Sequence, residues 1–340
     1  MKAVVLGAGG FIGHHLVKYL KGKGYWVRGV DLKYPEFENT QADEFLILDL
    51  RGYGECFDAT VGMEEVYNLA ADVGGIGYLS KYQSVILANN NKINTFILPA
   101  SYNNNVKKYF FSSSSCVYPT YLQASGMPII EESVLPAQPH DAYGWEKLFH
   151  EKMCEYTSID LDIQTRIARF FNVYGEMDVW QGGKEKSVAA LCRKVADAKL
   201  NGKNEIDVWG DGRQSRCYIH VDDCVEGIYR IMQSDYGKPL NLSNDNPVTI
   251  DNLIDVICNV ANWKVINKYN INEPIGSRFR NSDSSMVRNK LDWKARVSIE
   301  DGIARTYNWV EEQVKNEREE KVILPVINNI FALEKKEDKQ

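Results

Sequence analysis

Long apolar runs are missing from this sequence of 340 residues. None approaches the length of about 18 residues that a bilayer-spanning helix needs. The residues after Met1, KAVVLGAGG, are typical of a strand and its turn rather than of a cleavable leader. We therefore expect no membrane association and a cytoplasmic location.

Paired cysteines and clustered histidines are missing too. The seven cysteines are scattered and form no CxxC pair, and the five histidines show no metal-ligand spacing. This argues against a disulfide framework and a metal site, and it favours a reducing compartment. The net charge of −6 argues against a nucleic-acid partner. With 44% hydrophobic and 25% charged residues, the composition is typical of a globular protein.

Short apolar runs alternate with helical patterns over the first 170 residues, which predicts an α/β fold. Apolar strands separated by helices are typical of a doubly wound parallel sheet covered on both faces. The helical patterns include residues 11–24, which end in glycine, and the asparagine-rich run 87–105, whose asparagines we expect on a polar face. The predicted strands are KAVVLG, WVRGVD, FLILDL, EVYNLA, KKYFFS and DIQTRIARF.

The pattern changes near residue 175. A turn-rich segment, YGEMDVWQGGKEK, precedes a predicted helix at 187–200 and shorter elements that continue to about residue 314. We expect a first domain at 1–174, to which later segments return, and a smaller interleaved α/β lobe at 175–314. The charged and apolar tail at 315–340 docks either on the body or on a partner.

A glycine-rich turn, GAGGFIG, directly follows the first predicted strand. Glycine lets the backbone turn tightly and approach a pyrophosphate, and the start of the next helix offers free N–H groups to the anion. We therefore predict a dinucleotide site at Gly7, Gly10, Phe11, Ile12 and Gly13.

Two acidic residues extend this predicted site. Asp31 ends the second predicted strand, where a carboxylate can accept hydrogen bonds from both ribose hydroxyls and would repel a 2′-phosphate. This favours NAD over NADP, although Lys33 lies nearby, and the alternative role of Asp31 is a strand-end turn or a helix cap. Asp49 ends the third predicted strand and could reach the adenine ring.

The segment YGWEK supplies Tyr143 and Lys147 four residues apart, on one face of a predicted helix. A lysine beside a phenol is expected to lower the pKa of Tyr143 and make it an acid or base for a hydroxyl. The YxxxK pattern alone is common and is usually a surface pair. It gains weight because Ser114, at the end of a serine-rich strand, precedes it.

Glycine turn, strand-end serine and YxxxK, in this order, resemble the short-chain dehydrogenase/reductase superfamily. The lobe after residue 175 resembles that of its extended branch, which acts on nucleotide sugars. This resemblance covers about residues 1–315 and implies a Rossmann-like fold, bound NAD and a homodimer. Extended members that are dehydratases have an Asp-Glu pair after the serine. Here the matching residues are Ser115 and Cys116, which disfavours that activity.

The resemblance to the GDP-mannose 3,5-epimerases, within the NAD-dependent epimerase/dehydratase family, is closer. It implies an isomerase that oxidises C4 transiently with NAD, exchanges protons at C5 and C3, and reduces C4 again. It also implies Cys116 as base and Lys186 as acid, with Ser114, Tyr143 and Lys147 as the redox group. The segments that carry it are NLAADVGGIGY, SSSCVYP, DAYGWEK, RFFNVYG, WQGGKEK, WGDGRQSR and RFRNSD.

The same resemblance implies residues that contact a nucleotide-sugar substrate, with a GDP-hexose favoured. These are Gly74, Gly75, Ser114, Asn172, Glu185, Lys186, Lys194, Gln214 and Arg280. Arg216 is a further candidate for the diphosphate, because a guanidinium can bind two oxygens at once. Alternatives remain: Lys184 for the acid, Arg278 in place of Arg280, and packing rather than base stacking for Trp209. Cys116 itself either packs or reacts.

Three rival functions remain. A GDP-fucose synthase-like epimerase/reductase pairs a similar cysteine with a histidine acid and consumes NADPH, which Lys186 and Asp31 disfavour. A nucleotide-sugar 4-epimerase would make Cys116 incidental. A non-catalytic NAD-binding scaffold should have lost part of the redox group, whereas Ser114, Tyr143 and Lys147 are all present.

Overall fold

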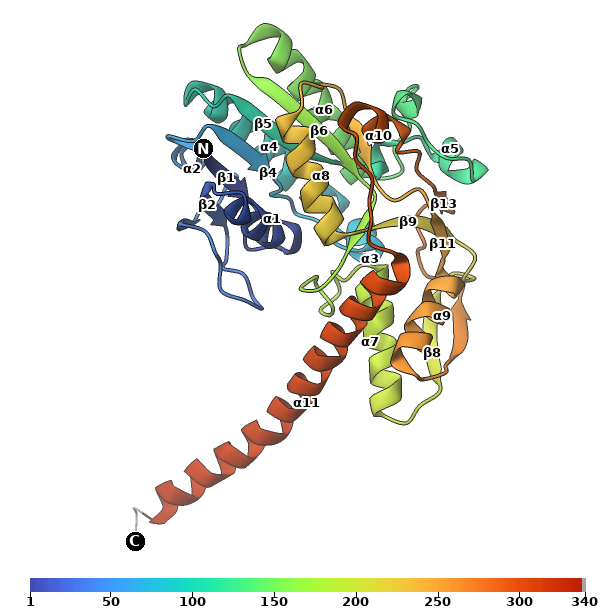
Figure 1. Ribbon diagram of the computed structural model, residues 1–340. Coiled ribbons are helices and arrows are strands. Elements are labelled where there is room, and N and C mark those ends of the chain that lie inside the picture. Colours follow the sequence, from blue (N-terminus) through green and yellow to red (C-terminus); the bar gives the residue numbers. More distant parts are fainter. Residues whose placement is uncertain (338–340) are drawn as a thin grey trace.

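The centre of the molecule is a sheet of seven parallel strands in the order β10-β6-β5-β4-β1-β2-β3. Figure 1 shows it in the computed structural model, which describes the backbone of residues 1–337 and the side chains of residues 1–319. The predicted doubly wound, Rossmann-like sheet is confirmed. Its strands are β1 (Lys2–Leu6), β2 (Trp26–Asp31), β3 (Glu44–Ile47), β4 (Glu65–Asn68), β5 (Lys108–Ser114), β6 (Gln164–Phe170) and β10 (Leu240–Leu242).

The six strands predicted from the first 170 residues are all present, with ends that differ from the prediction by up to three residues, most at the end of the third. β3 ends at Ile47, so Asp49 lies in the turn beyond the strand and not at its end. β3 is an edge strand, and its ladder with β2 stops where Asp31 pairs with Ile47. Because β2 itself ends at Asp31, no further partner extends β3.

Helices cover both faces of this sheet (Figure 1). Successive side chains of a strand point to opposite faces. In β1, Ala3 and Val5 therefore join the apolar core under α1 and α8, while Val4 and Leu6 join the core under α2, α4 and α6. Burial on both faces explains why the strands read as continuous apolar runs. These helices are α1 (Phe11–Gly22), α2 (Tyr53–Thr60), α4 (Gln83–Asn103), α6 (Ala142–Asp160) and α8 (Val221–Gln233).

The asparagine-rich run is helical as predicted, within α4, but the expectation that its asparagines occupy a polar face is wrong for two of them. Asn90 and Asn94 are buried, one turn apart, where α4 packs against α6. Both side-chain amides donate hydrogen bonds to the buried carboxylate of Glu146. Hydrogen bonding offsets the cost of burying a polar amide, which a helical pattern alone does not reveal.

The chain beyond β6 builds a second, smaller set of layers. A four-stranded sheet combines β11-β9-β13 with β7, and β8 pairs with β12. The helices α7, α9 and α11 enclose a core of their own beside these strands. The bounds are α7 (Ser187–Leu200), α9 (Ile250–Ala261), α10 (Ser285–Leu291), β7 (Asn172–Tyr174), β8 (Glu205–Trp209), β9 (Ser215–His220), β11 (Pro247–Thr249), β12 (Ile266–Asn270) and β13 (Phe279–Arg280).

The shorter helices link these layers, and α11 (Ile299–Glu337) ends the described chain. The tail predicted at 315–340 begins inside α11, which starts at Ile299. In Figure 1 this helix extends away from the body of the molecule. Residues 338–340 of that prediction lie outside the described part. None of the described helices is both long and apolar enough to cross a membrane. The shorter helices are α3 (Ile76–Lys81), α5 (Thr120–Ser125) and the 3₁₀ turns η1 (Ser115–Val117) and η2 (Glu131–Val134).

Candidate active site

A cavity of about 940 Å³ lies at the carboxyl ends of β1, β2, β4 and β5, and residues of the smaller lobe form its other wall. The strand order of the large sheet reverses between β1 and β4, which is where doubly wound folds bind ligands. Of the residues predicted for the site, Lys147 alone is not part of the lining. The others line it: Gly7, Gly10, Phe11, Ile12, Gly13, Asp31, Asp49, Gly74, Gly75, Ser114, Cys116, Tyr143, Asn172, Glu185, Lys186, Lys194, Gln214, Arg216 and Arg280.

The glycine turn between β1 and α1 is packed too tightly for side chains. Gly7 has a φ of +83°, and a Cβ on Gly13 would lie 2.0 Å from the Gly7 carbonyl oxygen. Helix α1 begins at Phe11 with Gly10 as N-cap, and no side chain caps its first N–H groups. The first N–H groups of α1 are therefore uncapped at the edge of the cavity, which fits the pyrophosphate of a dinucleotide.

The two acidic residues predicted for this site differ in environment. Asp31 accepts hydrogen bonds from the backbone N–H of Gly9 at 2.9 Å and of Leu32 at 2.6 Å, and burial raises the pKa of its carboxyl. Asp49 is half exposed, and its hydrogen bonds with Arg51 lower its pKa. Asp31 is thus fixed against the glycine turn, whereas Asp49 is paired at the cavity rim.

The serines of β5 alternate between two environments. Ser113 points away from the cavity centre and donates to the buried carboxylate of Glu151, which also pairs with Arg169. Ser114 points the other way: its Oγ accepts the N–H of Cys116 at 3.1 Å, and its hydroxyl slightly opposes the raised pKa of Tyr143. Strand alternation therefore explains how a serine run can be buried and yet supply the site.

Cys116 differs from the other buried cysteines. Those at 56, 154, 192, 217 and 224 belong to apolar core clusters, whereas Cys116 belongs to none of them and lines the cavity. Its sulfur lies 3.5 Å from Nη1 of Arg280. A cationic neighbour of this kind stabilises a thiolate, which is the reactive form of cysteine. The structure places Arg280 in that position.

The pair Tyr143 and Lys147 shows a different electrostatic balance from the one expected. Burial, followed by the carboxylate of Glu146, Cys116 and Asp141, raises the pKa of Tyr143, so the expected lowering by Lys147 is wrong for this structure. Lys147 is 1% exposed, with Nζ 5.4 Å from the centroid of the Tyr143 ring and 3.7 Å from Glu146 Oε1. The ammonium of Lys147 thus lies over the ring of Tyr143, and the carboxylate of Glu146 offsets its charge.

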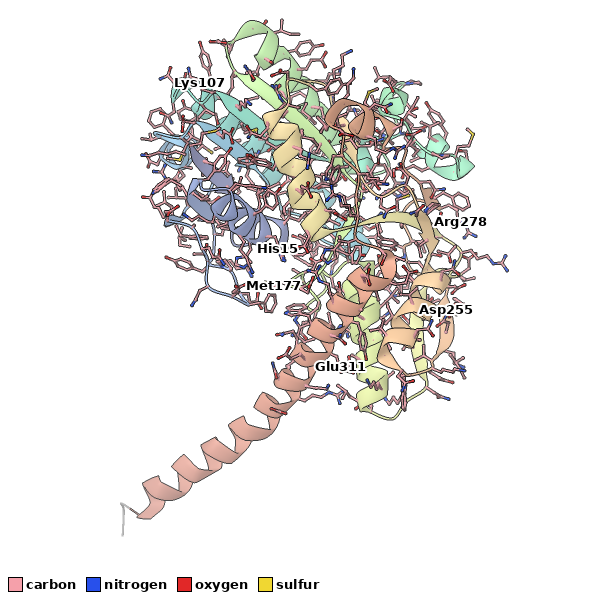
Figure 2. All side chains as sticks on the ribbon, viewed as in Figure 1. His15, Lys107, Met177, Asp255, Arg278 and Glu311 are labelled. Atoms are coloured by element: carbon pink, nitrogen blue, oxygen red, sulfur yellow. The ribbon has the colours of Figure 1, made fainter. Side chains whose placement is uncertain are left out.

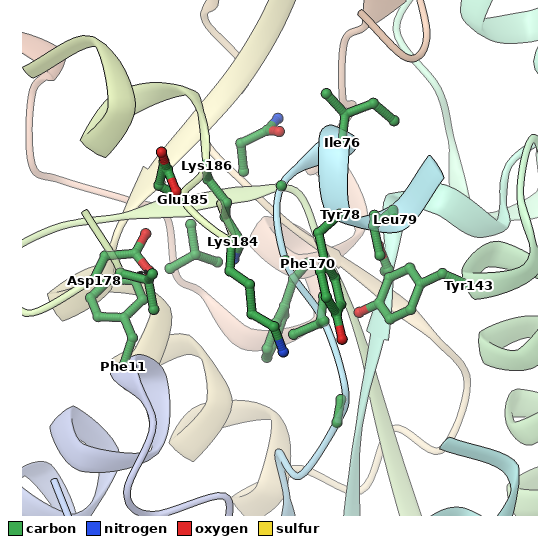
Figure 3. Close-up of a pocket in the computed structure, with 18 of the residues that line it drawn as sticks. Phe11, Ile76, Tyr78, Leu79, Tyr143, Phe170, Asp178, Lys184, Glu185 and Lys186 are labelled. Atoms are coloured by element: carbon green, nitrogen blue, oxygen red, sulfur yellow. Dashed lines mark hydrogen bonds between the residues drawn. The ribbon is translucent and has the colours of Figure 1, made fainter. Parts of the chain in front are cut away.

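The lysines at 184 and 186 are separated by their partners. Nζ of Lys184 lies 3.3 Å from Oδ1 of Asp72 and 4.1 Å from the centroid of the Tyr78 ring, and Figure 3 shows it directed toward that tyrosine. Lys186 is the N-cap residue of α7 and lines the cavity, with the buried Asp178 as a charged neighbour. Lys184 is therefore held by Asp72 and Tyr78, whereas Lys186 faces the cavity.

Gly75 explains how this lysine segment reaches the site. Its N–H donates to the carbonyl oxygen of Lys184 at 2.9 Å, and a Cβ on it would lie 2.2 Å from the carbonyl oxygen of Glu185. A side chain here would push segment 184–186 away. Gly74 likewise packs against Tyr78.

Two arginines face the cavity on adjacent strands. Arg216 of β9 and Arg280 of β13 are direct register partners. Burial and the charge of Arg280 lower the pKa of Arg216 to about 10, and its guanidinium donates to the carbonyl oxygens of Ser215 and Ile275. Two neighbouring guanidiniums without a carboxylate between them suit an anionic ligand. Arg278, the alternative to Arg280, instead pairs with Asp211 at 2.8 Å and does not line the cavity.

The remaining predicted contacts line the cavity but already have protein partners. Asn172 donates to the carbonyl of Cys217, Glu185 pairs with Arg193, and Lys194 donates to the carbonyl of Asp207. Gln214 donates to the carbonyl of Trp209, while its Oε1 is buried with no hydrogen-bond partner among the described residues. That oxygen is free to accept from a ligand. Trp209 itself lines the cavity and is 37% exposed.

Four further polar residues, which were not predicted from the sequence, line the cavity. Asp72, Tyr78 and Asn89 form a hydrogen-bonded cluster on the cavity wall, and Asp178 is 6% exposed there. Asp72 and Tyr78 lie in the segment NLAADVGGIGY, directly after β4, where side chains at the carboxyl end of a parallel strand reach the ligand. The position of this segment after a predicted parallel strand could have indicated Asp72 and Tyr78 as site residues.

A model of the NAD dependent epimerase/dehydratase family matches residues 3–243. The chain belongs to this family. It is 37% identical over 321 residues to GDP-mannose 3,5-epimerase 1 of Oryza sativa subsp. japonica, covering 94% of this chain and 84% of the relative. It is 28% identical over 322 residues to putative GDP-L-fucose synthase 2 of Arabidopsis thaliana, covering 94% of each. The UDP-glucose 4-epimerase of Thermotoga maritima, solved with UDP-glucose, shares the fold: the TM-score is 0.82 at 23% identity, covering 92% of this chain and 100% of that one.

Membership of the epimerase/dehydratase family makes the protein an NAD-dependent enzyme. Its own residues fit that cofactor: Gly7 and Gly13 leave the close approach that a pyrophosphate needs, and Asp31 stands at the end of β2. Ser114 and Tyr143 line the same cavity as this turn.

Proposed function

We propose that this protein is a nucleotide-sugar epimerase of the GDP-mannose 3,5-epimerase type. The observation that carries the proposal is Cys116, a buried thiol that belongs to no apolar cluster and lies beside Arg280 and the redox pair of Ser114 and Tyr143. The similarity to the rice enzyme supports the choice of sugar. Conversion of GDP-mannose to an epimer without added reductant, followed by NMR, tests it.

The redox step uses Tyr143 and Ser114. Bound NAD supplies the hydride acceptor at C4 and later returns the hydride, so that it is not consumed. Tyr143 takes the proton from the C4 hydroxyl, and Ser114 holds the same oxygen through its Oγ.

Proton exchange follows at the carbons next to the resulting ketone, which acidifies the hydrogens at C3 and C5. Cys116 as thiolate accepts one of these protons, and the electron pair of the C–H bond moves into the enolate. Lys186 then donates a proton to the opposite face of that carbon, which inverts it. We assign Cys116 and Lys186 because they line one cavity from different elements, η1 and the N-cap of α7.

Arg216 and Arg280 are proposed to bind the diphosphate, since both face the cavity without a carboxylate partner. The unpartnered Oε1 of Gln214 accepts an N–H or O–H of the nucleotide sugar. We place Gly74, Gly75, Asn172, Glu185 and Lys194 along the sugar and nucleotide, in the smaller lobe and its border with the large sheet. On this proposal residues 1–174 form the NAD-binding domain and also contribute Gly74, Gly75 and Asn172 to the substrate site, while residues 175–314 form the substrate lobe.

Replacing Arg280 by glutamine is expected to weaken GDP-mannose binding by about 10- to 100-fold, the value of one or two charge-assisted hydrogen bonds. Arg278→Gln is the matched control: its guanidinium is paired with Asp211 outside the cavity, and affinity should stay within about threefold of wild type. Isothermal titration with GDP-mannose measures both. Equal losses in the two variants would contradict the assignment.

We further propose a homodimer formed through α6. Its outward face presents Trp145, Phe149, Tyr156 and Ile159, which are 49%, 57%, 60% and 71% exposed. Their spacing places them on one side of the helix, and an apolar stripe of this kind is typical of a protein interface. The family resemblance supports a second copy of the chain as the partner.

The variant Phe149→Glu is expected to shift the protein from dimer to monomer in light scattering at micromolar concentration, because it places a charge in the middle of the stripe. Glu155→Gln, on the same helix but in an exposed pair with Lys152, should leave the mass unchanged. A monomeric wild type would contradict this proposal.

The seven unpaired cysteines suit a reducing compartment, and we propose that the protein is cytoplasmic.

A further inference from the structure

A buried carboxylate lies between the two residues of the YxxxK pair. Glu146 is 1% exposed and sits on α6 beside Lys147. Its oxygens lie 2.9 Å from Nδ2 of Asn90, 3.4 Å from Nδ2 of Asn94, 3.3 Å from Nδ1 of His150 and 3.7 Å from Nζ of Lys147. A fully buried carboxylate is costly unless its partners compensate for the lost water, and Glu146 has four such partners.

The charge of Glu146 has one clear counterpart. Asn90 and Asn94 are neutral, and the Nδ1 of His150 is also within 2.7 Å of the Glu146 carbonyl oxygen. Among the side chains that the structure describes, Lys147 provides the lysine or arginine nitrogen within 4.0 Å of the Glu146 carboxylate. Lys147 forms no other ion pair there, and its Nζ lies 4.8 Å from the ring centroid of Phe111. Carboxylate and ammonium therefore hold each other beneath Tyr143.

Asn90 connects this pair to the cavity wall. Its Oδ1 accepts the backbone N–H of Asp72 at 2.7 Å, and its Nδ2 donates to the Asp72 carbonyl at 3.1 Å as well as to Glu146. The Asp72 carboxylate in turn accepts from Tyr78 at 2.8 Å and lies 3.3 Å from Nζ of Lys184. A continuous set of hydrogen bonds thus runs from α6 through α4 to the lysine segment on the far wall.

We propose that Glu146 is a positioning residue of the redox step. Its buried carboxylate holds Lys147 beneath Tyr143 and, through Asn90, fixes the cavity-lining backbone at Asp72. The inference rests on the proposed function in so far as the redox step is the oxidation of C4. Glu146 acts through these neighbours and does not line the cavity itself.

The charge of Glu146 also acts on Tyr143. The titratable groups around this phenol are Glu146 and Lys147 on α6, Asp141 at its N-cap and Cys116 on η1, with Tyr78 on α3 nearby (Figure 3). After burial, Glu146 contributes most to the raised pKa. Removing this charge lowers the pKa of Tyr143, so the phenolate forms at lower pH.

The test compares Glu146→Gln, which keeps the shape and removes the charge, with Glu146→Asp, which keeps the charge. Glu155→Gln removes an exposed charge from the same helix. In each background, the near-ultraviolet phenolate absorbance of the NAD complex is titrated and the Tyr143→Phe spectrum is subtracted. We expect the midpoint of the Tyr143 titration to fall by about one pH unit in Glu146→Gln, a tenfold change in the ionisation constant. In Glu146→Asp and Glu155→Gln we expect it to stay at the wild-type value. An unchanged midpoint in Glu146→Gln overturns the proposal.

Hydrogen exchange provides a second readout that needs no variant. In wild type, the Asp72 amide is expected to be protected like the amides inside α4, although it lies in a loop. Exchange at the rate of an open loop overturns the link through Asn90. Neither readout requires turnover. A wild type that oxidises no nucleotide sugar therefore refutes the proposed function, while the titration and the exchange still decide the role of Glu146.

Discussion

Replacing Cys116 by serine is expected to reduce epimerisation at C3 and C5 by about a thousandfold, the middle of the range for general-base catalysis. A serine hydroxyl has nearly the same size but does not ionise beside Arg280 as a thiol can. NAD binding and reversible oxidation of C4 should persist, because Ser114 and Tyr143 are intact. NMR of the products measures the first effect, and absorbance of reduced cofactor after mixing with GDP-mannose measures the second.

A matched control for this variant is Cys258→Ser. Cys258 is partly exposed on α9 and lies outside the cavity lining, so its replacement should leave both measurements within about twofold of wild type. If Cys116→Ser retains epimerisation at C3 or C5, Cys116 is not the base. If it loses C4 oxidation as well, its role is in binding or folding.

Replacing Lys186 by glutamine should reduce kcat for epimerisation by about 100- to 1,000-fold, whereas Lys184→Gln should reduce it less than tenfold. The two side chains are matched in type and separated by one residue. Lys184 is held by Asp72 and the Tyr78 ring, while Lys186 has no hydrogen bond or ion pair of its side chain recorded among the described residues. An acid must reach the carbon it protonates, which favours the less constrained amine.

The two lysine variants are compared by the kcat of product formation and by NAD binding. Equal affinity for NAD in both shows that the cofactor site is intact. A larger loss of kcat in Lys184→Gln than in Lys186→Gln would contradict the assignment and would make Lys184 the acid.

The parts of the fold that depend on local pattern could be predicted from the sequence. The apolar runs of the large sheet are buried on both faces, and the glycine turn between β1 and α1 is set by residues 7–13 alone. The length of β3 could not be predicted, since it depends on where its neighbour β2 ends.

Contacts between segments that are distant in the sequence were harder to predict. The proximity of Arg280 to the sulfur of Cys116 joins residues 164 positions apart, and no spacing in the sequence indicates it. The direction of the Tyr143 pKa shift was wrong for a similar reason. The YxxxK pattern shows Lys147 beside Tyr143, but it does not show that the asparagines of α4 hold the carboxylate of Glu146 next to Lys147. From the sequence alone, Glu146 would be predicted to lie on the surface of the helix that carries Tyr143 and Lys147, whereas it is buried.

The most direct test of the proposed function is to incubate the protein with GDP-mannose in deuterium oxide, without added cofactor. Mass spectrometry and NMR of the recovered sugar then locate any deuterium. Proton exchange through Cys116 and Lys186 predicts deuterium at C5 or C3, epimerised product and no net reduced cofactor. A product inverted at C4 alone, without deuterium in the ring, would contradict it, because Cys116 would then have no proton to remove.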